Sequence, residues 1–218
     1  YDWETRQSFI SSDLGFSSDN WKTFAELGWL GISLSEESGG FGGTSIDTMI
    51  IMEEFGKGLV LEPFLETVVM CAGLIDMAGS PEQKKDILTG VVEGKTQLAM
   101  AYAEPQSRFN LSDVMTEAKK EGDNFILNGF KSVVMNGPNA HQIIVSARTS
   151  GDQRDDSGVS LFIVDANSSG LSSRDYQTVD NRRASELTLE SVMVPASSLL
   201  GELDEGLSIL ESSIDRSI

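Results

Sequence analysis

The sequence has very little cysteine and histidine. Its 218 residues include one cysteine, Cys71, and one histidine, His141. A single cysteine excludes a disulfide within the chain, as is typical of a reducing compartment, so we expect a cytoplasmic protein. A single histidine leaves little material for a metal centre or a histidine-dependent nucleophile. We therefore predict no metal site, a buried inert Cys71 and a structural or merely exposed His141.

Positive charge is also scarce, because 16 Lys and Arg stand against 34 Asp and Glu and give a formal net charge of -18. This charge repels nucleic acids and anionic membrane surfaces, so we expect neither as a partner. The longest apolar run, Val68 to Ile75, is too short to span a bilayer, and no signal peptide is visible. The chain starts at Tyr1 and stops within a helical pattern at Ile218, so we expect a piece of a longer protein.

The first part of the chain has the spacing of helices. Apolar residues recur at helical intervals from Trp21 to Leu30, after a plausible cap at Asp19-Asn20. A glycine-rich loop at 38–43 follows, and Thr44 with Asp47 three residues later gives a capping-box signal for a second helix. That helix is apolar on most sides, which predicts a place inside a bundle; its apolar residues are Ile46, Met49, Ile50, Met52 and Phe55.

Two more helices complete the helical region. Pro63 to Met77 predicts a third helix, and Ser80-Pro81 predicts the start of a fourth that runs to about Val92. After Gly94 the pattern changes to strands, with Asn128-Gly129 as a strong hairpin signal. The predicted strands cover Gln97–Ala103, Asp123–Leu127, Phe130–Met135, His141–Thr149, Gly158–Asp165 and Glu186–Val194.

Strands that cluster after helices predict an α+β multidomain chain. We expect an N-terminal helical bundle at residues 1–96, an antiparallel β-barrel middle domain at 97–202 and the start of a C-terminal helical domain at 203–218.

The residues alone give few catalytic leads. The glycines at 39–43 lack the spacing of a phosphate loop and follow no strand, which favours a structural turn. Arg182-Arg183 could meet a phosphate, but pairing at the surface is the more frequent role of such a doublet. These observations indicate no more than an α-then-β protein.

Several motifs nevertheless occur in a characteristic order. Glu37–Gly43 is followed by Ala101-Tyr102-Ala103-Glu104-Pro105, by Gly122-Asp123 through Asn128-Gly129-Phe130-Lys131, and by Val194-Pro195 with Leu200-Gly201. The ordered set resembles the acyl-CoA dehydrogenase family, which has A-x-T-E-P and G-D-x-(Y/F)-x-x-N-G-x-K at the second and third places. The stretches 101–114, 128–137 and 150–166 are similar to one branch of that family, the pimeloyl-CoA dehydrogenase small subunits, which pair with a large subunit of the same fold.

The resemblance implies an enzyme that carries out α,β-dehydrogenation of an acyl-CoA thioester, of medium chain length or dicarboxylic, with FAD as hydride acceptor. It also implies an electron-transfer acceptor protein and a homo- or hetero-oligomer of subunits with this fold as partners. The family's catalytic base resembles a feature of the C-terminal domain, beyond Ile218, so we assign no catalytic residue to this chain.

The resemblance also points to flavin contacts where this chain departs from the family. Ala103 replaces a threonine that bonds the flavin, which leaves the backbone N–H groups of Ala103 and Tyr102 as donors. Phe109 stands where a phosphate-binding serine is usual, and Arg108 could replace that contact. Val133, Val134 and Met135 replace W-I-T, so we expect Val133 and Met135 at the flavin, although plain strand core is an equal alternative.

The last position concerns the substrate. Asp215 keeps the first residue of a helix motif D-x-x-R, while Ile218 stands where the arginine would meet CoA, so Asp215 is the expected substrate-binding residue. Two alternatives remain open beside the enzyme. One is a flavin-free structural subunit of a hetero-oligomeric acyl-CoA dehydrogenase, and the other is an acyl-CoA-binding module without a redox role.

Overall fold

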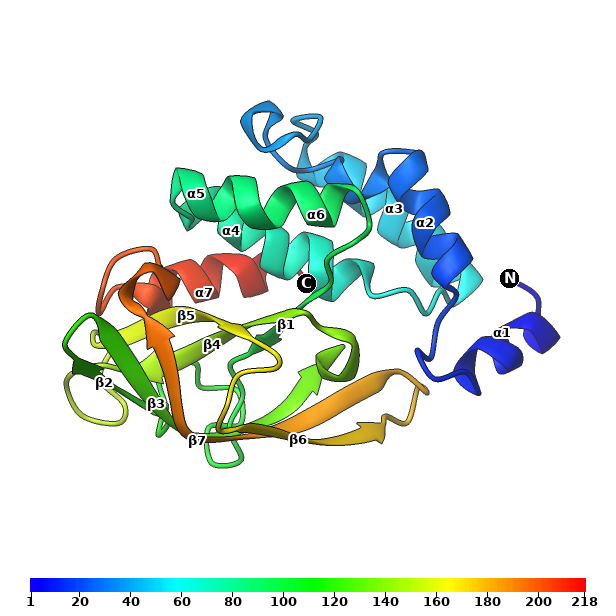
Figure 1. Ribbon diagram of the computed structural model, residues 1–218. Helices are drawn as coiled ribbons and strands as arrows, with labels where there is room; N and C mark the ends of the chain where they lie inside the picture. Colours follow the sequence, from blue (N-terminus) through cyan, green and yellow to red (C-terminus); the bar gives the residue numbers. More distant parts are fainter.

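The computed structural model describes residues 1–218 and consists of a helical layer that rests on a curved sheet (Figure 1). None of its helices combines the length and the hydropathy that crossing a bilayer requires. The helical part runs in chain order through α1 (Trp3–Ile10), α2 (Ser18–Glu26), η1 (Trp29–Gly31), η2 (Glu36–Ser38), α3 (Ser45–Gly58), η3 (Leu65–Ala72), α4 (Gly73–Ala78), α5 (Pro81–Gln83), η4 (Lys84–Leu88) and α6 (Thr89–Val92).

The helix starts follow from their capping residues. Thr44 caps α3 and forms the predicted capping box with Asp47, and Ser80 caps α5 in a second capping box with Gln83. The cap of α2 is Ser17, whose side chain accepts from the backbone N–H of Asn20, so the predicted cap at Asp19-Asn20 lies two residues too late. A serine hydroxyl in extended backbone is a favourable N-cap, which explains the earlier start.

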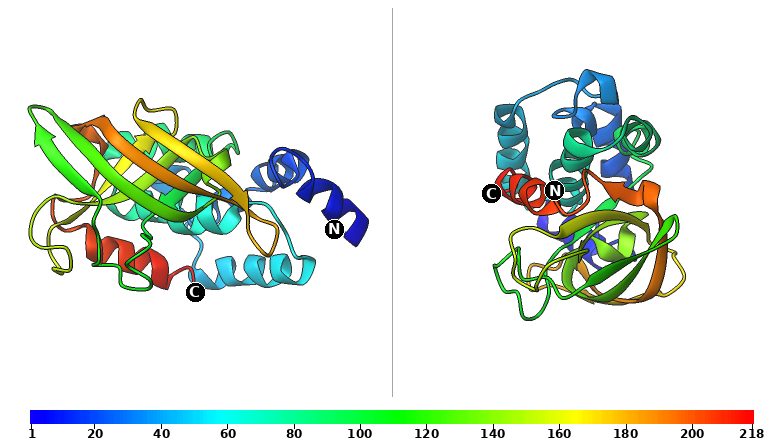
Figure 2. Two further views of the ribbon diagram at one scale, coloured as in Figure 1. Left: turned by 90° about the horizontal axis from the view of Figure 1, so that it is seen from below. Right: turned by 90° about the vertical axis from the view of Figure 1, so that its left-hand side faces the viewer.

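The sheet region contains eight strands, β1 (Leu98–Ala101), β2 (Glu117–Glu121), β3 (Asn124–Met135), β4 (Gln142–Arg148), β5 (Val159–Asp165), β6 (Leu171–Gln177), β7 (Arg183–Pro195) and β8 (Leu199–Leu200). The order along the sheet is β6-β7-β3-β2-β4-β5-β8, with β1 beside β4. Figure 2 shows how these strands curve around a common interior. The predicted helical domain followed by a sheet-rich domain is confirmed, but β1 lies parallel to β4 and so departs from the expected antiparallel pattern.

The hairpin predicted at Asn128-Gly129 is wrong. Strand β3 continues through both residues with a register shift against β7, and the turn that reverses the chain lies at Gly122-Asp123, between β2 and β3. The Asn128 side chain accepts from the backbone N–H of Ser191. A Cβ on Gly129 would lie 2.4 Å from the Thr116 hydroxyl. The two residues therefore form a β-bulge with close backbone packing rather than a turn.

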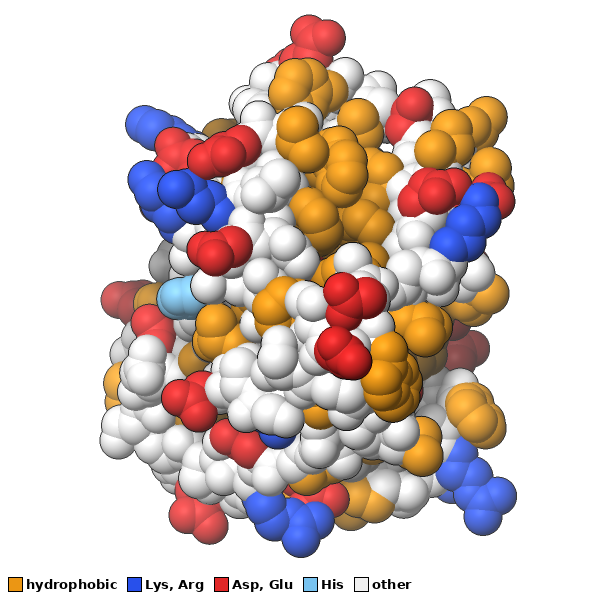
Figure 3. Space-filling model, turned by 90° about the vertical axis from the view of Figure 1, so that its right-hand side faces the viewer, with side chains coloured by type: hydrophobic (Ala, Val, Ile, Leu, Met, Phe, Trp, Pro, Cys, Tyr) orange, Lys and Arg blue, Asp and Glu red, His pale blue; other side chains and the backbone are white.

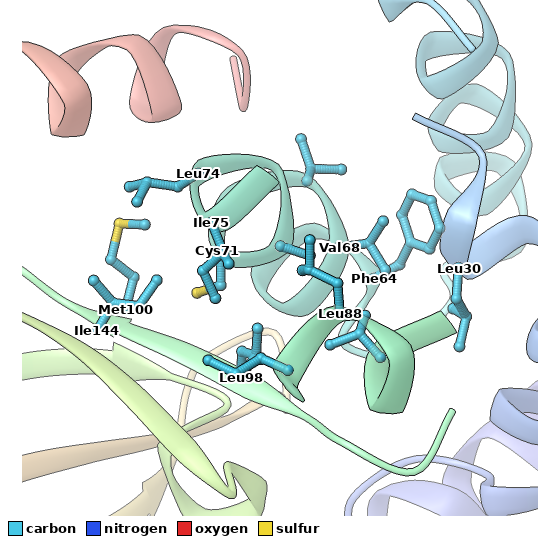
Figure 4. Packing of buried hydrophobic residues seen from close by; sticks show 14 of the residues in the cluster. Leu30, Phe64, Val68, Cys71, Leu74, Ile75, Leu88, Leu98, Met100 and Ile144 are labelled. Atoms are coloured by element: carbon cyan, nitrogen blue, oxygen red, sulfur yellow. The ribbon is translucent and has the colours of Figure 1, made fainter. Parts of the chain in front are cut away.

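Strand β1 separates two hydrophobic cores. Leu98 and Met100 pack into the core that the helices share with β4 and β5, while Ala99 and Ala101 face the interior of the sheet. Figure 4 shows Leu98, Met100 and Ile144 facing Cys71, Leu74 and Ile75 of the helical layer. Because side chains alternate along a strand, one short strand serves both cores.

The expected burial of the second predicted helix is wrong, because α3 has no buried residue. Met52 and Phe55 pack partly on the core, but Ile46, Met49 and Ile50 are 61%, 58% and 53% exposed. Figure 3 faces the side of the molecule that carries α2 and α3, and it shows hydrophobic side chains gathered in a hollow. The helix therefore contributes one stripe to the core and leaves another uncovered in this chain.

Candidate functional site

The segment that follows β1 leaves the sheet and returns against β3. The backbone N–H of Ser132 donates to the carbonyl of Ala103 at 2.9 Å. Ser132 directly precedes Val133, so this bond brings the two predicted segments Tyr102-Ala103 and Val133–Met135 to one corner of the sheet. We call residues 102–103 and 132–135 the β1–β3 corner.

Two backbone donors of this corner are free. The N–H groups of Tyr102 and Ala103 donate to no acceptor within the protein. Both residues are half-buried, and burial raises the pKa of the Tyr102 phenol, which stays neutral at physiological pH. The corner therefore presents two adjacent neutral donors that a ligand's acceptor atoms can use.

A β-bulge shapes the other side of the corner. Val133 has a φ of 52°, a left-handed conformation that is a genuine outlier for a β-branched residue. The register between β3 and β7 shifts between Lys131 and Val134 at this point. As a result Val134 is fully buried in the sheet interior, Val133 is 54% exposed and Met135 is half-buried. Such strain costs about 1–3 kcal/mol and tends to occur at functional sites.

A buried ion pair lies directly beneath this corner. The ammonium of Lys131 is 2.7 Å from the carboxylate of Glu104 and 3.0 Å from the hydroxyl of Ser146. The side chains of Lys131 and Glu104 are 0% and 2% exposed. The same carboxylate accepts the backbone N–H groups of Met115 at 2.8 Å and of Thr116 at 3.0 Å.

The charges of this pair are held in opposite ways. Burial raises the pKa of Glu104, but Lys131 and the hydrogen bonds to the carboxylate outweigh burial and leave that pKa below its usual value. Burial lowers the pKa of Lys131 to about 8, although Glu104 counteracts it. Neither residue was predicted to have a role at the site. The inward alternation of Phe125, Leu127 and Lys131 along β3 was the signal that could have found the lysine.

The loop after Glu104 is fixed by further polar contacts. The amide of Gln106 donates to Glu104 at 2.8 Å, and Asp113 accepts from Gln153 at 2.6 Å and from Arg154 at 2.7 Å. The hydrogen bond from Gln153 is the main reason why the pKa of Asp113 is lowered. The loop is therefore held at both ends, close to Glu104 and close to Asp113.

This loop presents Arg108 and Phe109 to solvent. Arg108 has a φ of 51° and forms no ion pair or hydrogen bond through its side chain, and Phe109 is 99% exposed. Both residues are predicted flavin contacts, but neither contacts the β1–β3 corner through a hydrogen bond. They remain available for contact with another molecule.

Asp215, the predicted substrate-binding residue, lies apart from the six predicted flavin contacts. It is the last residue of α7 (Gly206–Asp215), is exposed, and shares no hydrogen bond or ion pair with them. Helix α7 packs on the helical layer, where the Ser213 hydroxyl donates to the carbonyl of Met70 at 3.0 Å. The residues after it, 216–218, line an open cleft of about 1050 Å³ together with residues of α3, η3 and α4.

The remaining sequence leads have structural roles. Cys71 is fully buried, and burial raises the pKa of its thiol. His141 accepts the backbone N–H of Gln97 at 3.0 Å through Nδ1. Arg182 pairs with Glu66 of the helical layer, and Arg183 donates to the carbonyl of Ser12 at 2.8 Å. The arginine doublet therefore joins the β6–β7 connection to the helices and is engaged within the chain.

Comparison with known proteins places both parts of the chain in one family. Residues 4–95 match the acyl-CoA dehydrogenase N-terminal domain, and residues 99–192 match the acyl-CoA dehydrogenase middle domain. Isobutyryl-CoA dehydrogenase of Dictyostelium discoideum is 31% identical over 204 residues, which is 92% of this chain and 49% of that protein. The chain therefore spans about half the length of this relative.

Solved structures with the same fold agree with this assignment. The FAD complex of PigA superposes with a TM-score of 0.87 at 26% identity, over 97% of this chain and 56% of that one. The ChsE4–ChsE5 complex from Mycobacterium tuberculosis superposes with a TM-score of 0.86 at 25% identity, over 97% of this chain and 55% of that one. The chain, which provides the N-terminal helical and the middle sheet-rich domains, belongs to the acyl-CoA dehydrogenase family.

Proposed function

We propose that this chain is part of an FAD-dependent enzyme that dehydrogenates an acyl-CoA thioester between its α and β carbons. The observation that carries the proposal is the pair of free backbone N–H groups of Tyr102 and Ala103, which stand in the family's A-x-T-E-P segment. The finer assignment, a medium-chain or dicarboxylic acyl group, follows the resemblance to pimeloyl-CoA dehydrogenase small subunits.

The residues of the β1–β3 corner fit a flavin through the backbone rather than through side chains. A flavin pyrimidine edge presents carbonyl oxygens, which two adjacent N–H donors can bind. Ala103 and Met135 have no hydroxyl, so the side-chain donors that the family uses there are absent. A neutral hydrogen bond contributes only about 0.5–1.5 kcal/mol. Losing two of them weakens the site without removing the backbone donors.

Each part of the corner has a distinct task in this proposal. When bound, FAD supplies the acceptor for the hydride that leaves the β carbon. Tyr102 and Ala103 would hold the pyrimidine edge through their N–H groups. Val133, which the bulge turns outward, would help to exclude water from the bound group. We place the base that removes the α proton outside residues 1–218.

A second candidate function rests on the same substitutions. Ala103, Phe109 and Met135 lack the hydroxyl groups that the family directs at the flavin, which favours a subunit that completes a partner's enzyme without holding its own FAD. The related ChsE4–ChsE5 structure is a complex of two named proteins. We propose a homo- or hetero-oligomeric assembly for this chain as well, with an electron-transfer acceptor protein as redox partner.

The visible absorption spectrum of the full-length protein decides between the two candidates. The protein is purified alone and together with its partner subunit, and its FAD content per chain is measured. The enzyme proposal expects FAD in this chain and acyl-CoA-dependent bleaching of the flavin, and a panel of medium-chain and dicarboxylic acyl-CoA thioesters then ranks the substrates. Absence of FAD from this chain in both preparations would refute the first candidate and support the second.

The substitution Arg108→Ala tests the loop's contribution to FAD binding. Arg108 is exposed and unpaired, so its removal costs the fold little, but a lost contact to a phosphate lowers FAD affinity by roughly tenfold, the equivalent of about 1.4 kcal/mol. Titration with FAD and a melting temperature are measured for both proteins. Arg174→Ala, which removes an exposed arginine of β6 that pairs with Glu186, is the control. Equal FAD affinity of Arg108→Ala and wild type would contradict this role.

A further inference from the structure

The buried ion pair of Glu104 and Lys131 lies where the two segments of the β1–β3 corner meet. Glu104 follows Ala103 in the chain, and Lys131 precedes Ser132. The ion pair therefore runs beside the hydrogen bond from the Ser132 N–H to the Ala103 carbonyl. These two neighbouring links clamp the segment that carries the free N–H donors onto the strand that carries the Val133 bulge.

Hydrogen bonds connect the Glu104–Lys131 pair to the rest of the sheet. One carboxylate oxygen of Glu104 receives Lys131 and the Thr116 N–H, and the other receives the Met115 N–H and Gln106. Lys131 also donates to the hydroxyl of Ser146 on β4. A buried network in which both carboxylate oxygens and the ammonium have partners favours one arrangement, because any shift leaves a charged group unpaired.

We propose that Glu104 and Lys131 are positioning residues that fix the distance and direction between the N–H donors of Tyr102-Ala103 and the outward-facing Val133, and thereby tune the site for the flavin. This inference rests on the proposed function. Neither side chain reaches the surface, so neither contacts the flavin itself. Their effect passes through the backbone of the residues next to them, Ala103 and Ser132.

The arrangement resembles the support that binding sites in general require. A ligand site is held to within about 0.5 Å only if the residues that form it are fixed by others behind them. The bulge at Val133 also needs such support, because a strained backbone persists only where its surroundings determine it. The ion pair provides that support one residue before Ser132, at the start of the bulge.

The test uses the full-length protein with its partner and compares three variants, Glu104→Gln, Lys131→Met and the double variant Glu104→Gln/Lys131→Met. The double variant removes both charges, so that no buried charge is left unpaired and folding is preserved. Asp76→Asn is the matched control, because the Asp76 carboxylate also accepts a backbone N–H and two hydroxyls, but within the helical domain.

Two quantities are measured. The first is the hydrogen-exchange rate of the Ser132 amide in FAD-free protein, which reports the corner directly. We expect it to rise at least about tenfold in Glu104→Gln and in the double variant, and not in Asp76→Asn. The second is the dissociation constant for FAD together with the flavin's visible spectrum. We expect about tenfold weaker binding and a shifted spectrum, even where the double variant regains its melting temperature.

The outcomes separate this proposal from the proposed function. If the double variant keeps the wild-type exchange rate at Ser132 and the wild-type affinity for FAD, the pair stabilises the fold only and the positioning role is wrong. If wild-type protein binds no FAD, the proposed function fails, and the Ser132 exchange rate alone decides the positioning role. Unchanged exchange in the double variant would then overturn it.

Discussion

The chain contains two largely buried ion pairs, and they are built differently. Glu104 and Lys131 are 2% and 0% exposed, and every oxygen of that carboxylate has a partner. Glu66 and Arg182 are 4% and 25% exposed, and the second oxygen of Glu66 has none. The difference comes from the backbone. The N–H groups of Met115 and Thr116 lie in a loop and donate to the Glu104 carboxylate. The N–H groups around Glu66 are instead used in the hydrogen bonds of the helix.

Burial alone therefore does not define the role of an ion pair. The pair in the sheet fixes several backbone groups of one corner at once. The pair between η3 and the β6–β7 connection joins two parts of the chain through a single contact. Four variants, in order of expected effect, can separate these roles.

The largest effect is expected for Lys131→Met. This substitution leaves the Glu104 carboxylate buried without its counter-charge, which typically costs about 3–5 kcal/mol of unfolding free energy. Urea unfolding followed by fluorescence measures the change. The double variant with Glu104→Gln should lose distinctly less, and an equal loss in both would show that the charge pairing is not what the lysine contributes.

A smaller loss, about 1–3 kcal/mol, is expected for Arg182→Met. Glu66 again loses its partner, but the guanidinium is partly exposed and water can reach the freed space. The same urea titration provides the measurement. A loss as large as that of Lys131→Met would mean that the two ion pairs contribute equally to stability.

The pH dependence of stability distinguishes Glu104 further. Its pKa in the folded protein is below its ordinary value of 4.5. Its contribution is therefore fully present above that value and is lost as the pH falls through the folded pKa. Between pH 7 and pH 3, wild type should lose more unfolding free energy than Glu104→Gln. Parallel curves for the two proteins would show that folding does not lower the pKa of Glu104.

The smallest effect is expected for Arg174→Met. The guanidinium of Arg174 is 77% exposed and pairs with Glu186 across the outer face of β6 and β7. Exposed pairs of this kind contribute less than about 1 kcal/mol, and salt screens them. The melting temperature should stay within about 2 °C of wild type. A larger change would reveal that the β6–β7 surface is more constrained than its exposure indicates.

Much of the fold could be predicted from local signals. The capping box at Thr44 and the Ser80-Pro81 signal predicted the starts of two helices, because a cap and the residues of the first turn are close in sequence. Strand β6 was missed, because Leu171–Gln177 is polar and exposed on both faces and has no hydrophobic alternation. The hairpin at Asn128-Gly129 failed because a favourable turn sequence also suits a bulge when another segment packs closely on the glycine.

The candidate site was only partly accessible to the same reasoning. The resemblance predicted Tyr102, Ala103 and Val133 as flavin contacts, but the free N–H groups and the left-handed conformation of Val133 depend on how distant segments meet. The Glu104–Lys131 pair joins residues that are 27 positions apart. Sequence alone could place the lysine inside the sheet, but it could not identify the carboxylate that compensates its charge.

The two-sided strand β1 has a consequence for how this protein can be divided. Two domain families meet between residues 95 and 99, yet Leu98 and Met100 complete the interior of the first while Ala99 and Ala101 complete that of the second. Cutting the chain at that junction would remove Leu98 and Met100 from the core of the helical part and expose these apolar side chains to water. The boundary between the two family domains is therefore not a boundary between folding units, and the two parts should unfold together in one cooperative transition.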